Sequence, residues 1–271
     1  MIKEITIGQY YPGDSFVHRL DARVKVILTI VFIVLIFMCK NFVSFAVSLL
    51  LVVLTMLLSK VPVKMYLKNI KAILPIILLT SVLNVFYIRG GTELVNWRFI
   101  HIYSKGIFTA IFISLRILLL IIASSALTYT TTPTLLTDAI ERLLSPLSKL
   151  HIDVHTFAMM MTLALRFIPT LIEEIDRIMN AQKARGADLE SGSFLQRAKA
   201  LVPIIIPLIV SSVKRAYELA FAMECRCYSG GEGRTRMKKM KVGARDIVTL
   251  SVFAVSLAGI IILNYFFGSL M

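Results

Sequence analysis

Two arginines, each flanked by small residues, are the strongest candidates in this sequence for specific chemistry. They lie in the tripeptides Ala184-Arg185-Gly186 and Cys225-Arg226-Cys227. A guanidinium group offers a planar fork of donors that can hold a carboxylate through two parallel hydrogen bonds. Small neighbours would let the end of a helix enter a groove on a partner, so the pattern predicts docking. Alternatively, both are ordinary solvated cations near helix C-termini, favoured by about 0.3–1 kcal/mol; the pattern alone does not separate the two.

Each tripeptide follows a segment with helical character. After Pro169, hydrophobic residues recur on one helical face, at Leu171, Ile172, Ile175, Ile178 and Met179. That segment ends at Ala184, and Gly186 is the residue type that best tolerates the left-handed backbone closing a helix. A second segment follows Pro207 and ends at Cys225-Arg226-Cys227. The two form an approximate repeat, predicted as proline-started helices that each present one arginine.

The sequence contains no phosphate-binding loop. None of its glycines at 186, 192, 230, 231 and 233 is followed by the Lys-Ser/Thr pair that such a loop needs. By that route the chain cannot hydrolyse ATP, so any energy from ATP must come from a partner. We therefore expect neither an enzyme nor a directly bound cofactor.

Metal binding and redox chemistry are also not expected. His151 and His155 are four residues apart, which places both on one helical face, but a zinc site needs a third ligand and usually a fourth. The other histidines are His18 and His101. Cys225 and Cys227 are better explained as small packing residues than as a redox pair.

Two other functional classes are considered. A membrane-embedded enzyme, such as a lipid-modifying transferase, would need His151, Asp153, His155 and the Thr130–Thr134 cluster to converge on one site. A nucleic-acid or anionic-lipid binder would need a one-sided basic block with interleaved aromatic residues. Acidic residues instead occur throughout the basic region, so no nucleic-acid partner is expected.

Composition places the elements that carry these residues in a membrane. Of the 271 residues, 57% are hydrophobic, and the mean hydropathy is +0.80. About 20 apolar residues cross the hydrocarbon layer as a helix. Five stretches approach this length and predict an all-α polytopic protein: Val24–Cys39, Phe42–Leu58, Ala72–Ile88, Ile107–Leu127 and Ile247–Phe267. Arg116 lies within the fourth stretch, where pairing inside the bundle is one explanation and a functional role is the other.

The distribution of Lys and Arg predicts the orientation, because positive loops stay on the cytoplasmic side. Basic residues occur in the first 23 residues and between the second and third spans, at Lys60, Lys64, Lys68 and Lys71. We therefore expect a cytoplasmic segment 1–23, a four-span region 24–127, a cytoplasmic helical domain 128–246 and a last span 247–271. The amino terminus would lie inside and the carboxyl terminus outside. Thr132 and Pro133 predict a helix start, and Val154–Ile172 is a possible sixth span.

Several motifs, in order along nearly the whole chain, resemble the transmembrane T component of energy-coupling factor transporters, also called the cobalt-transport Q-type family. They are the segments Gly8-Gln9-Tyr10-Tyr11-Pro12-Gly13-Asp14-Ser15, His18-Arg19-Leu20-Asp21-Ala22-Arg23, Leu165-Arg166-Phe167-Ile168-Pro169, Ala184-Arg185-Gly186 and Glu224-Cys225-Arg226-Cys227-Tyr228. Two positions depart from the family pattern. Ala22 stands where proline is usual, and Cys225-Arg226-Cys227 stands where Ala-Arg-Gly is usual, which leaves the turn after Arg226 open.

The resemblance implies a prokaryotic plasma-membrane importer of vitamins or other micronutrients. In such an importer, two cytoplasmic ATPases use ATP, a small membrane S component binds the substrate, and the T component links them. Carried over to this sequence, Arg185 and Arg226 would each pair with an acidic groove on one ATPase. The resemblance does not identify the substrate, because that choice belongs to the S component.

Overall fold

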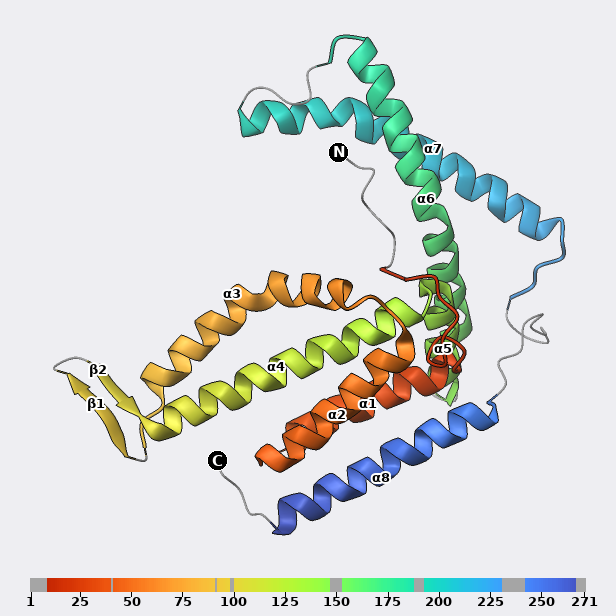
Figure 1. Cartoon of the computed structure of the whole chain (residues 1–271). Helices are drawn as coiled ribbons and strands as arrows, with labels where there is room; N and C mark the ends of the chain where they lie inside the picture. The colour runs from red at the N-terminus through yellow and green to blue at the C-terminus, as the bar shows by residue number, and fades with distance from the viewer. Residues whose placement is uncertain are drawn as a thin grey trace. The chain divides into compact units, whose positions relative to one another are not determined.

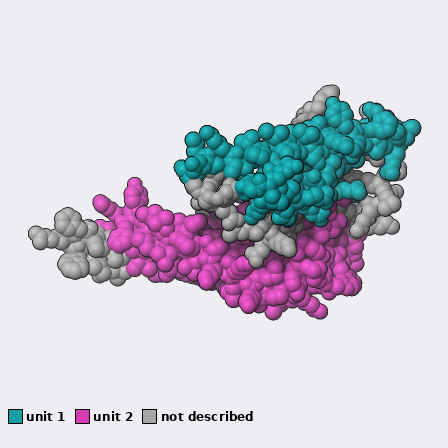
Figure 2. All heavy atoms as spheres, turned by 90° about the horizontal axis from the view of Figure 1, so that it is seen from above, with its two compact units in different colours: residues 1–8, 141–238 teal, residues 9–140, 239–271 magenta. Residues whose placement is uncertain are grey.

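The computed structural model describes residues 9–39, 41–90, 92–97, 100–146, 153–187, 193–230 and 242–266. The chain forms two compact units (Figure 2). The bundle unit comprises residues 9–140 and 239–271, and the arginine unit comprises residues 141–238 with residues 1–8.

The bundle unit is built from long apolar helices (Figure 1). They are α1 (Ala22–Met38), α2 (Phe42–Ser59), α3 (Val63–Tyr87), α4 (Ser104–Thr130) and α8 (Ala244–Phe266). A helix satisfies its own backbone hydrogen bonds, which a lipid environment requires. Helix α4 packs against α1, α2 and α3, and α8 packs against α1 and α2. Each of the five predicted spans coincides with one of these helices.

Six helical segments in the described part of the chain are long and apolar enough to cross a membrane. Four are α2, α3, α4 and α8; the others are α6 (Val154–Ala184) and residues Lys199–Glu224 of α7 (Phe194–Glu224). Helix α1 has 17 residues, the short end of the spanning range. The predicted class, an all-helical multi-pass membrane protein, is confirmed.

The predicted helix boundaries at the prolines are wrong. Helix α6 begins at Val154 and contains Pro169 in its interior, and α7 continues through Pro203 and Pro207. Proline removes one helical hydrogen bond and crowds the carbonyl four residues earlier, so it bends or breaks a helix. Here each proline is flanked by several turns of helix-compatible sequence on both sides, and the helices continue. By contrast, α5 (Pro133–Leu144) starts where predicted, with Leu135 N donating to Thr132 Oγ1 at 3.4 Å.

Two connections also differ from expectation. The third span was predicted to begin at Ala72, but α3 begins at Val63, so the link from α2 shrinks to residues 60–62. Lysine is a good helix former, so charge alone does not end a helix. The loop before α4 contains an antiparallel hairpin, β1 (Glu93–Trp97) and β2 (Ile100–Tyr103), which was not predicted.

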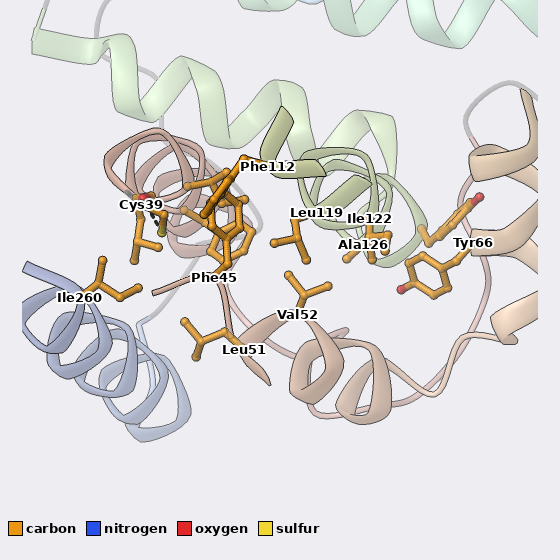
Figure 3. Close-up of a cluster of buried hydrophobic side chains, with 14 of the residues drawn as sticks. Cys39, Phe45, Leu51, Val52, Tyr66, Phe112, Leu119, Ile122, Ala126 and Ile260 are labelled. Carbon is orange, nitrogen blue, oxygen red and sulfur yellow. Dashed lines mark hydrogen bonds between the residues drawn. The ribbon is translucent and has the colours of Figure 1, made fainter. Parts of the chain in front are cut away.

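The core of the bundle unit surrounds α4 (Figure 3). Phe112 of α4 is 1% exposed and lies 5.2 Å, centroid to centroid, from the ring of Phe45 in α2. Toward the other end of α4, Tyr129 packs edge-to-face on Tyr66 of α3 at 5.2 Å and donates its hydroxyl hydrogen to Met65 O at 3.1 Å. Buried aromatic pairs add about 0.5–1.5 kcal/mol beyond area burial. These contacts fix α2 and α3 on α4.

Side chains from later helices cap the C-terminal end of α1. Arg116 Nη2 donates to Cys39 O at 3.3 Å, and its guanidinium lies 5.4 Å from the centroid of Phe37. Asn264 Nδ2 donates to Met38 O at 2.8 Å, and Ser44 Oγ donates to Asn264 Oδ1 at 2.9 Å. A cation is favoured at a helix C-terminus, where carbonyls lack partners. Arg116 therefore has a structural position within the bundle.

The N-terminal end of α1 is tied to α4 and α8. Asp246, which is 4% exposed, accepts from Asp21 N at 2.9 Å and from Gly243 N at 2.8 Å. Lys25 Nζ donates to Thr130 O at 2.9 Å. Buried polar groups are costly unless hydrogen-bonded, so these contacts together specify how three helix ends meet.

Candidate partner-docking site

Arg185 is held in a Schellman motif at the end of α6. Gly186 N donates to Lys183 O at 3.0 Å, and Ala187 N donates to Gln182 O at 3.0 Å. Gly186 has φ +85°, the left-handed backbone that this motif requires. The predicted helix end with glycine in a left-handed conformation is confirmed.

Arg226 lies in an equivalent motif at the end of α7. Cys227 N donates to Glu224 O at 2.8 Å, and Tyr228 N donates to Met223 O at 3.0 Å. Cys227 has φ +55°, so it takes the place that Gly186 has after Arg185. The turn after Arg226, which the sequence left open, thus has the same hydrogen-bond pattern as the turn after Arg185. A non-glycine residue in this conformation costs about 1–2 kcal/mol, which the motif must offset.

Both motifs present exposed surfaces. Arg185, Gly186, Arg226 and Cys227 are all exposed, as are Ala184 and Cys225. Among the described residues, neither arginine has an ion pair with a carboxylate. A guanidinium at a rigid helix end keeps its donors available for a partner carboxylate or for water. The arrangement therefore suits the docking of two matching acidic surfaces.

The two helices that carry the motifs cross one another (Figure 1). Arg215 Nη2 of α7 donates to Glu174 Oε2 of α6 at 2.7 Å, and the Glu174 side chain is 16% exposed. Gln182 Nε2 donates to Pro203 O at 3.4 Å. The Glu174–Arg215 pair was not predicted, because its members are 41 residues apart and no local sequence pattern links them.

Breaking the Glu174–Arg215 pair is expected to loosen this crossing. Arg215→Ala should reduce the free energy of unfolding of the arginine unit by about 1.5–3 kcal/mol, as expected for a hydrogen bond to a charged group. Arg177 is the matched control, because it lies 3.9 Å from the same carboxylate with its side chain 75% exposed. A double-mutant cycle with Glu174→Ala, followed by denaturant unfolding, measures the coupling. A coupling energy of zero would contradict the assignment.

Gly186 and Cys227 both have a left-handed backbone, so replacing the glycine and introducing one are expected to have opposite effects on stability. Gly186→Ala should destabilise the end of α6 by about 1 kcal/mol, because a Cβ is strained at positive φ; space is not the reason, since no atom lies within 4 Å of the added Cβ. Cys227→Gly should relieve the same strain at the end of α7. Cys225→Gly is the control, because Cys225 has φ −58°. Glycine gains nothing from that backbone conformation, so this variant should reduce the stability of the end of α7 by about 0.5–1 kcal/mol. Amide hydrogen exchange in the last turns measures all three, and equal signs at 225 and 227 would refute the argument.

The residues considered for a membrane enzyme have structural partners where they are described. Asp153 accepts from Thr156 N at 3.0 Å and from Thr156 Oγ1 at 2.6 Å, which lowers the pKa of its carboxyl below the usual value and caps α6. His155 Nδ1 lies 3.0 Å from Glu141 Oε1. His151 lies outside the described residues. In the described part of the chain, no cluster of three His, Cys, Asp or Glu side chains could hold a metal ion.

Comparison with known proteins gives a consistent result. Residues 13–237 match the cobalt transport protein family. The energy-coupling factor transporter transmembrane protein of Clostridium kluyveri is 51% identical over 265 residues, covering 97% of this chain and 98% of the relative. Proteins of the same name from Ruminiclostridium cellulolyticum and Bacillus subtilis are 47% and 45% identical, over 98% and 94% of this chain and 100% and 97% of their own lengths.

The agreement extends beyond the helices to the ends that carry the arginines, because the family match includes both Schellman motifs. Identity at this level over nearly the full length of both chains establishes common descent and a common fold. The chain belongs to the cobalt transport protein family, among the transmembrane proteins of energy-coupling factor transporters.

Proposed function

We propose that this chain is the energy-coupling subunit of an ATP-driven importer of vitamins or other micronutrients. It links two cytoplasmic ATPases to a small membrane subunit that binds the substrate. The observation that carries the proposal is the pair of equivalent helix ends, each presenting one exposed arginine after the same two hydrogen bonds. Two equivalent docking elements suit two ATPase subunits.

The crossing of α6 and α7 supports transmission of force. Each helix has 31 residues, and the Glu174–Arg215 pair joins them near the crossing. A continuous helix of this length extends about 45 Å at 1.5 Å per residue. A displacement applied to one arginine motif would therefore move a long lever rather than a flexible loop.

An exposed apolar stripe on α7 supports a second, membrane-embedded partner. Its residues recur at helical spacing: Ile206, Ile209, Val210, Val213 and Tyr217, with exposed fractions of 58, 56, 63, 49 and 75%. A contiguous exposed apolar surface indicates a protein or lipid contact. We assign it to the substrate-binding subunit, while the chain itself binds no cofactor and leaves ATP to its partners.

The proposed orientation keeps both arginine motifs in the cytoplasm, with the amino terminus inside and the carboxyl terminus outside. It follows from the basic residues near α1 and α3, which stay on the cytoplasmic side. Accessibility of single introduced cysteines to an impermeant reagent, in a background that lacks the native thiols, tests this arrangement.

Purification of the tagged chain in mild detergent from its native membrane tests the proposed function. We expect mass spectrometry to find two ATPase subunits, or two copies of one, together with a small hydrophobic protein, and the eluate to hydrolyse ATP. A chain that purifies without nucleotide-binding partners would contradict the proposal.

A further inference from the structure

Four lysines line the start of α3, where a loop was predicted. Lys60 ends α2 in the left-handed conformation, with φ +53°, and Lys64, Lys68 and Lys71 follow within α3. All four are exposed. Because three of them are helical, their relative directions are fixed by the helix rather than left to a flexible connection.

The helical lysines form one stripe, here called the lysine stripe (Lys64, Lys68 and Lys71). At about 100° per residue they fall within an arc of about 60°. Tyr66, which is 1% exposed and packs on Tyr129 of α4, lies about 200° from Lys64 in the same projection. The lysine stripe therefore faces away from the helix that α3 packs against.

No acidic side chain of the neighbouring elements offsets this charge. The sequence from Phe42 to Thr92 contains no Asp or Glu, and α4, which packs against α3, contains none either. None of the ion pairs in the described part of the chain includes a residue of the stripe. Within the described residues, the three ammonium groups therefore have no carboxylate partner and can bind anions from outside the chain.

The apolar surroundings identify the source of those anions. Val63, Leu67 and Leu74 flank the stripe and are 59, 57 and 50% exposed. Pro75 follows directly, and α3 bends along its length (Figure 1). A helical segment with lysines on one face and exposed apolar residues beside them suits the boundary between headgroups and acyl chains.

We propose that residues 63–74 of α3 form a binding site for anionic phospholipid headgroups. The lysine stripe binds the headgroup phosphates while Val63, Leu67 and Leu74 contact the upper acyl chains. Lysine suits this role because its long apolar stem can lie along the lipid while the ammonium reaches the phosphate. The bend at Pro75 then directs the rest of α3 into the hydrocarbon. The inference is independent of the proposed docking of ATPases.

Native mass spectrometry of the purified full-length chain tests this proposal, with phosphatidylglycerol and phosphatidylcholine added in equal amounts. The wild-type chain should retain phosphatidylglycerol preferentially, and less so at high salt. The variant K64Q/K68Q/K71Q should bind it about 150-fold more weakly, since each basic residue near the surface contributes about fivefold. K64R/K68R/K71R should keep the preference, because it keeps the charge.

A charge-matched control separates the stripe from net charge. K105Q/K199Q/K214Q removes three lysines elsewhere and should leave the preference for phosphatidylglycerol unchanged. The proposal is overturned if the wild-type chain shows no preference, or if the stripe variant and the control variant behave alike. It is also overturned if the stripe variant keeps its lipid but loses a co-purifying acidic protein, which would make the stripe a protein contact. Because the measurement is of the lipid bound to this chain, failure of ATPase docking would not affect it.

Discussion

The double variant R185A/R226A is expected to lose stable association with the ATPases and, with it, ATP-driven uptake. Each substitution removes a guanidinium from an exposed helix end whose backbone geometry is otherwise intact, because the Schellman motifs are formed by main-chain groups. Truncating one side of a buried, hydrogen-bonded charge pair costs about 2–5 kcal/mol. Two losses of this size would turn a stable complex into one that dissociates during purification.

Two lysine variants test whether the arginines bind through two parallel hydrogen bonds. R185K and R226K keep the charge but lack the planar fork, so they should restore association only in part. R177A is the control, because Arg177 is a comparably exposed arginine on α6 outside both motifs. Co-purified ATPase and uptake of substrate into vesicles are the measurements. Normal assembly of R185A/R226A would refute the docking role, and full activity of both lysine variants would refute bidentate pairing.

The second large effect is expected at Asp246. Replacing it by alanine removes a buried carboxylate that accepts from two partly buried N–H groups, those of Asp21 and Gly243. A hydrogen bond to a charged group contributes about 1.5–3 kcal/mol, and the two donors are only partly buried, so D246A should reduce the free energy of unfolding of the bundle unit by about 2–5 kcal/mol. The reduction should show as a lower midpoint in thermal unfolding of the purified chain.

Asp14 provides the control for this experiment. It also accepts hydrogen bonds, from Arg19, which lowers the pKa of its carboxyl, but its side chain is 68% exposed. Exposed pairs are screened by water and contribute little, so D14A should hardly shift the midpoint. D246N keeps one acceptor oxygen and should fall between D246A and the wild-type chain. A midpoint for D246A equal to that of D14A would contradict the assignment.

The membrane helices were predictable because length and hydropathy are local properties. All five expected spans lie on α1, α2, α3, α4 and α8, and the helix start at Pro133 is as predicted. The errors lie where a local rule was overridden. Pro169 and Pro207 were expected to start helices, but extended helical sequence on both sides keeps the helices continuous.

The candidate site was predictable in its residues but not in its geometry. Small-Arg-small tripeptides stand out in the sequence, and Gly186 indicates its own backbone conformation. Cys227 does not, because cysteine rarely adopts positive φ and only the three-dimensional structure shows that it does so here. The pairing of Glu174 with Arg215, and the capping of α1 by Arg116 and Asn264, depend on contacts distant in sequence.

The two ends of α1 have a consequence for biosynthesis. One end is held by Asp246, 225 residues after its partner Asp21, and the other by Asn264, 226 residues after Met38. Helix α1 leaves the ribosome before α8 and therefore obtains these partners only when α8 is made. Until α8 is made, Asp21 N and Met38 O must form hydrogen bonds with water, lipid headgroups or the insertion machinery. A chain that stops before α8 should thus remain a substrate for membrane quality control.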